Sequence, residues 1–203
     1  MYEKILEEAL FVSHYGSFVY GTFIEGVSDK DYIAVIPDIY KSFNGTQYDV
    51  YNRQYTFYTK SYWENMLISN DVTAIETFFL PEKFILKNEY EFKTIINKEF
   101  VRREFSATAS NSFVKAKKKL TIEKDFNPRI AKKSLWHALR ILNFGIQIIE
   151  QDKITDYSSM NYLYNEIVNC EIDDWEYYKE KYKPLYNSLK TKFKLAHPIR
   201  LKK

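Results

Sequence analysis

The pattern of apolar residues changes near Asn97, and this change constrains the fold more than any other feature of the sequence. Before it, short apolar runs such as 31–36 are bounded by Gly, Pro, Asp or Asn, which is typical of β-strands. After it, apolar residues recur at helical spacing over long segments. The sequence therefore predicts an α+β protein. Residues 1–97 are expected to form a core with a small mixed β-sheet and flanking helices, and residues 98–203 a helical domain.

The first part is expected to begin with a helix over 2–9 and to contain two further helices over 61–67 and 72–79. Its predicted strands cover 10–14, 31–36, 48–51, 54–58 and 84–86, and Asn52–Arg53 is expected to turn the third into the fourth. In the second part, helices are expected near 98–120, 129–150, 159–169 and 174–195. Pro184 is expected to kink or break the last of these, because proline removes a helical hydrogen bond.

The stretch from Gly16 to Asp31 carries the chemistry of the chain. Asp29 and Asp31 stand two apart at the start of a predicted strand, so both carboxylates are expected to point to the same face. Two acids placed this way repel unless a cation lies between them, and oxygen ligands of this kind suit Mg²⁺ or Mn²⁺. Gly16 and Ser17 follow the preceding strand, where a small residue and a hydroxyl can grip a triphosphate. The plain alternative for both pairs is an ordinary polar turn.

The ordered combination of a strand, Gly16-Ser17, a gap of eleven residues and Ser28-Asp29-Lys-Asp31 resembles the signature of polymerase-β-type nucleotidyltransferases. The segments 67–79 and 133–145 resemble two helices of the branch of that superfamily linked to RNA repair, the RNA-ligase-associated polymerases. The resemblance extends from about Tyr15 to Ile154. It implies a nucleotidyltransferase core with metal on Asp29 and Asp31, and nucleoside triphosphate, for example ATP, as the substrate.

The same resemblance implies a third carboxylate on a neighbouring strand, where it would help to bind the catalytic metal. Asp49 is the candidate by its order in the chain and its place on a predicted strand. Counting back from the 70–76 helix, however, puts the family's acid nearer Arg53 or Gln54, and neither is acidic. Either the register slips by several residues, or the third acid is missing and turnover is weak or absent.

Two groups of basic residues lie in the helical part. Lys133, His137 and Arg140 share one helical ridge, from which they would reach a triphosphate or an acceptor strand, or form a solvated polar face. The run of Lys115, Lys117, Lys118 and Lys119 is typical of a solvated helix surface. A net charge of +3 permits contact with nucleic acid without arguing for it.

The expected function is Mg²⁺-dependent transfer of NMP from an NTP to a hydroxyl acceptor, which the resemblance suggests is an RNA end. The alternatives are transfer of AMP to a protein or small molecule, and a degenerate protein that binds nucleotide or a partner without chemistry. A single cysteine, Cys170, excludes an internal disulfide, and zinc is not expected. An acidic N-terminus and the lack of a long apolar run predict a cytoplasmic protein that does not enter the membrane. The sequence does not set the oligomeric state.

Overall fold

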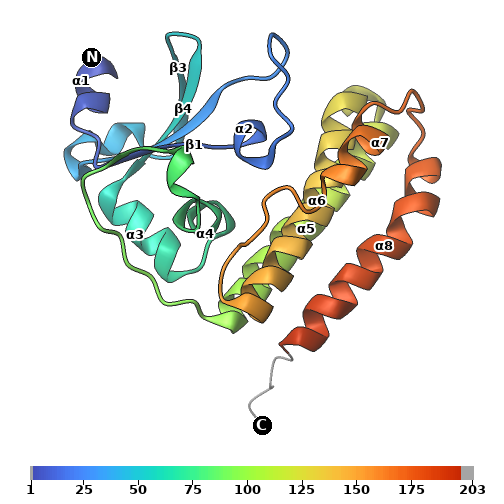
Figure 1. Cartoon of the computed structure of the whole chain (residues 1–203). Coiled ribbons are helices and arrows are strands. Elements are labelled where there is room, and N and C mark those ends of the chain that lie inside the picture. Colours follow the sequence, from blue (N-terminus) through green and yellow to red (C-terminus); the bar gives the residue numbers. More distant parts are fainter. Residues whose placement is uncertain (1, 198–203) are drawn as a thin grey trace. The chain divides into compact units, whose positions relative to one another are not determined.

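A computed structural model describes residues 2–197 of the chain, which divides into two compact units, 1–95 and 96–203 (Figure 1). The first unit contains a β-sheet with helices, and the second consists of helices, so the predicted mixture of α and β structure is confirmed. The division falls two residues before the boundary expected from the sequence.

The sheet of the first unit has five strands in the order β3-β4-β2-β1-β5. Their bounds are β1 Phe11–His14, β2 Asp31–Ile36, β3 Thr46–Val50, β4 Arg53–Thr59 and β5 Ile85–Asn88. The pair β2–β4 is parallel and the other neighbours are antiparallel, which makes the sheet mixed, as expected. β2 therefore lies between β1 and β4, and β3 is separated from β2 by β4.

The two faces of the sheet are covered by different helices. On one face, Tyr32, Ala34 and Phe57 pack with Ile5 and with Ala9, which follows helix α1 (Tyr2–Glu7). Rings of the 3₁₀-helix η1 (Asp38–Phe43) complete this core. The opposite face lies against α3 (Lys60–Ile68), which is followed by α4 (Val72–Phe78). Because side chains alternate along a strand, Asp31 points to the same face as the buried Ile33 and Val35, which is the α3 face.

The turn between β3 and β4 differs by one residue from the prediction. Tyr51 and Asn52 occupy it with φ of 54° and 60°, whereas Asn52–Arg53 was expected. Two consecutive residues with positive φ are typical of the tight hairpin turns that match the twist of the strands. Arg53 therefore begins β4 and Gln54 is its second residue.

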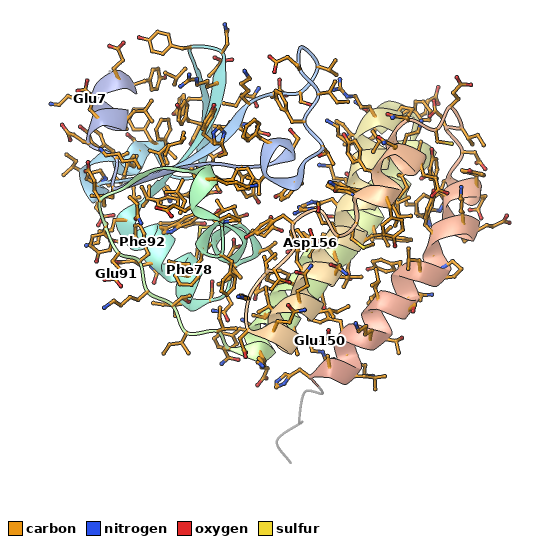
Figure 2. All side chains as sticks on the ribbon, in the orientation of Figure 1. Glu7, Phe78, Glu91, Phe92, Glu150 and Asp156 are labelled. Atoms are coloured by element: carbon orange, nitrogen blue, oxygen red, sulfur yellow. The ribbon has the colours of Figure 1, made fainter. Side chains whose placement is uncertain are left out.

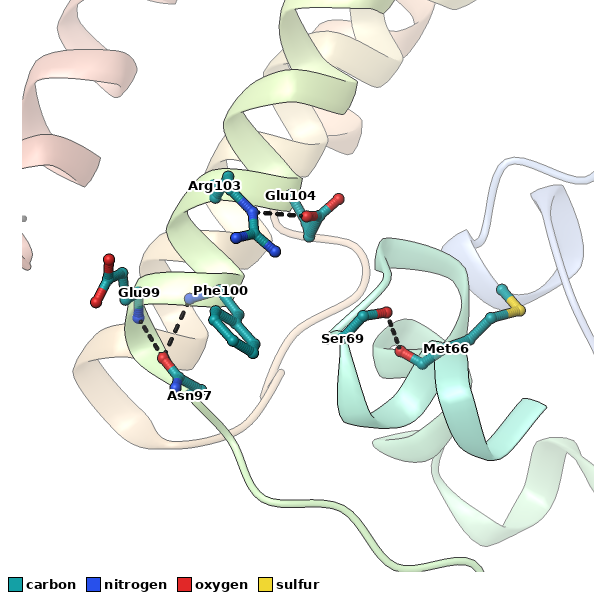
Figure 3. A network of polar contacts seen from close by, with 7 residues as sticks. All are labelled: Met66, Ser69, Asn97, Glu99, Phe100, Arg103 and Glu104. Atoms are coloured by element: carbon teal, nitrogen blue, oxygen red, sulfur yellow. Dashed lines mark hydrogen bonds and ion pairs between the residues drawn. The ribbon is translucent and has the colours of Figure 1, made fainter. Parts of the chain in front are cut away.

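The second unit is built from α5 (Lys98–Thr121), α6 (Pro128–Gln151), α7 (Tyr164–Val168) and α8 (Trp175–Ala196). Three of these helices begin with an acidic or amide side chain that accepts hydrogen bonds from the first turn, which stabilises a helix start. Figure 3 shows the first of these caps, in which Asn97 Oδ1 accepts from the backbone N–H of Glu99 at 3.0 Å and of Phe100 at 3.2 Å.

The expected break at Pro184 does not occur, because α8 continues as one helix from Trp175 to Ala196. The missing N–H of Pro184 deprives only the carbonyl of Glu180, and this residue is exposed, so water can satisfy it. Tyr182 and Tyr186 are buried on either side of the proline and fix both halves of the helix.

A buried amide fastens the loop after α6. Gln147 Oε1 accepts hydrogen bonds from the backbone N–H of Thr155 and Asp156, and its Nε2 donates to the Asp156 carbonyl. Asp156 is labelled in Figure 2. None of the helices within residues 2–197 has the length and apolar composition needed to cross a membrane.

Candidate functional site

The end of β1 lies directly beside the start of β2, and this places Gly16 against Asp31. The backbone N–H of Tyr15 donates to the Asp31 carbonyl at 2.9 Å, which extends the β1–β2 pairing by one residue. Gly16 has φ of +63°, and a Cβ atom built on it would lie 2.6 Å from Oδ2 of Asp31. The carboxylate therefore occupies the space that any side chain at position 16 would need, and only glycine fits both the backbone and the contact.

The next residues form the short helix α2 (Ser17–Tyr20). Tyr15 and Tyr20 stand on either side of Gly16 and Ser17, and both donate hydroxyl hydrogen bonds to Glu76 Oε2 on α4, at 3.4 Å and 2.6 Å. Glu76 is only 1% exposed. This buried carboxylate thus fixes both flanks of the Gly16–Ser17 turn to the body of the unit.

A loop from Gly21 to Lys30 leads from α2 to β2, and Ser28 closes it. Ser28 Oγ accepts from the Ile24 N–H at 3.0 Å, and the Ser28 N–H donates to the Ile24 carbonyl at 2.8 Å. Ser28 therefore shapes the loop directly before the two acids. Asp29 is exposed and lines an open hollow of about 490 Å³ together with Phe23, residues 25–28, Lys30 and residues 51–53. Asp31 is half-buried at the start of β2.

Asp49 does not lie next to Asp31. Asp31 pairs with Gln54 across β2–β4, and Gln54 pairs with Asp49 across β4–β3. The three side chains share one face of the sheet, but Asp49 is two strand spacings from Asp31, roughly 10 Å between backbones. Its Oδ1 accepts from the Asn52 N–H at 3.1 Å, so it also serves the hairpin turn. The side chain beside Asp31 on the neighbouring strand is an amide, Gln54.

Two carboxylates lie at the start of β2, Asp29 in the preceding loop and Asp31 on the strand itself. Mg²⁺ is usually held by one or two carboxylates together with water and phosphate oxygens, and Asp29 and Asp31 supply such a pair. The Asp31 carboxylate itself lies against the Gly16 backbone, in the space that a Cβ atom would take. Within residues 2–197, no group of three or more His, Cys, Asp or Glu side chains is arranged to hold a metal ion.

His14, the last residue of β1, stacks on Phe18 of α2 with ring centroids 4.3 Å apart. Burial lowers the pKa of His14 from its usual value, and the positive charges of Arg53 and Lys30 lower it further. The imidazole is therefore neutral near pH 7, and it positions α2 through ring packing rather than through charge.

The basic ridge of α6 belongs to the second unit, and the structure shows that it is not a solvated face. Arg140 is fully buried and packs over the rings of Trp136 and Phe144. Its Nη2 lies 2.8 Å from His137 Nδ1, and since a guanidinium can only donate, His137 accepts this bond. Burial lowers the pKa of His137 to about 3, with further contributions from Arg140 and Lys115. His137 is thus neutral, and Lys133 is half-buried.

Sequence reasoning did not identify Tyr15, Tyr20 and Glu76 as a group that positions the turn. A usable signal existed, because Glu76 is an acid among the apolar residues of a short predicted helix, and such a carboxylate needs a hydrogen-bonding partner when it is buried. The two tyrosines on either side of Gly16 and Ser17 were the nearest aromatic hydroxyls in the motif.

Comparisons with known proteins identify no relative with which this geometry could be compared. No protein-family model matches the chain, and neither a curated protein nor a solved structure is significantly similar to it.

Proposed function

We propose that the first unit binds a nucleoside triphosphate with Mg²⁺ or Mn²⁺, and that the protein transfers NMP from it to a hydroxyl acceptor such as an RNA end. The observation that carries this proposal is the close approach of the Gly16 backbone to the Asp31 carboxylate. The Asp31 carboxylate leaves no room for a Cβ atom at position 16, and a turn that binds no ligand would not require this close approach. The same approach brings the Gly16–Ser17 turn and a carboxylate, which is a suitable ligand for Mg²⁺, to one place.

Each residue has a defined task in this proposal. Asp29 and Asp31 provide the carboxylate oxygens, and the Ser17 hydroxyl donates to a phosphate oxygen. Gly16 keeps the phosphate chain close to Asp31, and the Tyr20–Glu76 hydrogen bond holds the turn in place before the ligand arrives. A bound divalent cation would supply neutralisation of the charge that develops on the transferring phosphate.

A second candidate, nucleotide binding without turnover, is favoured by one specific observation. The residue that pairs with Asp31 on the adjacent strand is Gln54, an amide, and Asp49 lies one strand farther away. An amide binds a metal more weakly than a carboxylate and cannot accept a proton from an attacking hydroxyl. The two candidates share the ligand and differ only in the chemical step.

The two candidates are separated by measuring binding and transfer on the same set of proteins. The wild type and the variants Asp29→Asn, Asp31→Asn and Asp49→Asn would each be incubated with the four labelled NTPs, Mg²⁺ or Mn²⁺, and a mixture of RNA and protein acceptors. Metal-dependent nucleotide affinity is determined in parallel by calorimetry.

Transfer of label by the wild type that is lost in Asp31→Asn supports the enzyme. Label on protein rather than on RNA would identify the AMP-transfer alternative. Nucleotide binding that requires Asp31, without label on any acceptor, supports the binding protein. Equal nucleotide affinity in the wild type, Asp29→Asn and Asp31→Asn contradicts both candidates. If Asp49→Asn behaves as the wild type, Asp49 is not a ligand.

A further inference from the structure

The turn that joins α5 to α6 concentrates positive charge. Residues 115–133, here named the hairpin tip, contain eight basic and two acidic residues, a net charge of +6. The whole chain carries only +3, so the residues outside the hairpin tip are net negative. The hairpin tip is therefore one of two strongly basic segments of the second unit; the other, residues 179–203, contains nine basic residues and one acidic residue.

Most of these charges are not neutralised within the protein. Of the lysines at the tip, Lys119 pairs with Asp125 and Lys132 pairs with Asp173 at 2.6 Å. Five others form no ion pair within residues 2–197, namely Lys115, Lys117, Lys118, Lys124 and Lys133. On α8, Lys179, Lys181 and Lys192 each lie beside a glutamate.

Helix stability does not explain the positions of all the basic residues at the hairpin tip. Lysines in the last turn of α5, such as Lys118, are favourable there because the C-terminal end of a helix is negative. The first turn of α6 contains the basic Arg129 and no acidic residue, although the N-terminal end of a helix is positive. Lys132 and Lys133 follow in the next turn, and Lys133 has no ion pair within residues 2–197.

An aromatic side chain is held in the solvent among these lysines. Phe126 is 52% exposed, and it lies in a connection with fixed backbone geometry. The Phe126 N–H donates to the Glu123 carbonyl at 3.2 Å, and the next residue, Asn127, donates its N–H to the Lys119 carbonyl at 2.8 Å. The Asn127 side chain also caps α6 through the N–H of Ile130. Phe126 is therefore displayed by an ordered turn.

We propose that the hairpin tip binds single-stranded nucleic acid, with the unpaired lysines along the phosphate backbone and Phe126 stacked on a base. Unpaired lysines match a chain of phosphates, and an exposed ring among them matches unpaired bases, whose faces are inaccessible in a duplex. The inference does not depend on nucleotide binding by the first unit, because it concerns residues 115–133 alone and is tested without any NTP.

The test is the fluorescence anisotropy of a labelled oligouridylate of about twelve nucleotides, within the usual site size of single-strand binders. Five lysine–phosphate contacts predict a slope of log affinity against log salt of roughly −3.5, a loss on the order of 100-fold between about 50 and 200 mM salt. The variant Lys117→Ala/Lys118→Ala/Lys124→Ala should reduce the slope to about −1.4, which is a loss of about sevenfold over the same range.

Two further variants make the measurement specific. Lys179→Ala/Lys181→Ala/Lys192→Ala removes the same total charge from paired positions on α8 and should keep the wild-type slope. Phe126→Ala should weaken binding about tenfold with the slope unchanged, because stacking is not a salt-dependent contact. Circular dichroism checks that each variant keeps its helices.

The proposal is overturned by any of three results: no binding at low salt, equal loss in the two triple variants, or binding to phosphatidylserine vesicles in preference to the oligonucleotide. Binding of an RNA duplex as tightly as the single strand also contradicts the role of Phe126.

Discussion

Replacing Gly16 with alanine should remove ligand binding while leaving the fold intact. The new Cβ would lie 2.6 Å from Asp31 Oδ2, and ordinary contact begins at 3.4 Å, so the carboxylate must retreat by about 0.8 Å. A rotation of the Asp31 side chain would achieve this. The displaced oxygen, however, is the proposed metal ligand, and a misplacement of this size costs on the order of 100-fold in a preorganised site.

Gly45→Ala provides a matched control within the same unit. Gly45 has φ of +70° and Gly16 has φ of +63° with ψ of −140°, so an alanine at either position carries backbone strain of roughly 1–3 kcal/mol. A Cβ on Gly45 meets no atom within 4 Å. Both variants therefore carry backbone strain, and only Gly16→Ala disturbs the carboxylate.

The assay compares urea unfolding with Mn²⁺-dependent binding of a non-hydrolysable NTP for both variants. We expect a loss in the free energy of unfolding in both variants and a loss of binding only in Gly16→Ala. If the two variants bind nucleotide equally well, the contact between Gly16 and Asp31 has no part in a ligand site and the reasoning fails.

Three other outcomes follow from the structure. Tyr20→Phe removes a 2.6 Å hydrogen bond to the buried Glu76 and should lower the free energy of unfolding by about 1–3 kcal/mol in chemical denaturation; an unchanged value would show that this bond does not hold the turn. The pKa of His137 is lowered from 6.5 to about 3, so its contribution to stability is complete above pH 6.5 and is lost as the pH falls toward 3, by up to about 1.4 kcal/mol per pH unit. His137→Asn should therefore unfold with a weaker dependence on pH between these values than the wild type, and parallel curves would contradict the assignment. Gln54→Glu places a carboxylate beside Asp31 and should raise the Mn²⁺ affinity measured by electron paramagnetic resonance. Each 1.4 kcal/mol of added binding free energy corresponds to about a tenfold rise in affinity. No rise would show that the two side chains do not share an ion.

Local pattern was sufficient to predict most helices and strands of this chain. Helix α5 was expected over 98–120 and is observed at Lys98–Thr121, and β2 was expected and is observed over residues 31–36. Both have strong periodicity and clear boundary residues, which are local properties. The error at Pro184 arose because proline chemistry is local, whereas the buried tyrosines on either side of it belong to the tertiary packing.

The ridge on α6 shows a different limit of sequence reasoning. Spacing correctly placed His137 and Arg140 one turn apart, and they share a hydrogen bond. It could not show whether the ridge is solvated, because burial depends on residues that are distant in the chain. The full burial of Arg140 and the low pKa of His137 are consequences of that packing.

The identity of the side chain beside Asp31 depends on the topology of the sheet and not on the local sequence pattern. Asp49 precedes Gln54 in the chain and lies on a strand, so order alone favoured it. The hairpin between β3 and β4 is antiparallel, and only one of its two strands can pair with β2. The parallel partner is β4, which brings Gln54 beside Asp31 and moves Asp49 to the outer strand. The sequence shows both residues, but it does not show which strand of the hairpin pairs with β2. Under the proposed function, the difference between an enzyme and a binding protein rests on whether Asp29 and Asp31 carry enough negative charge for the chemical step when their neighbour on β4 is the amide of Gln54 rather than a carboxylate.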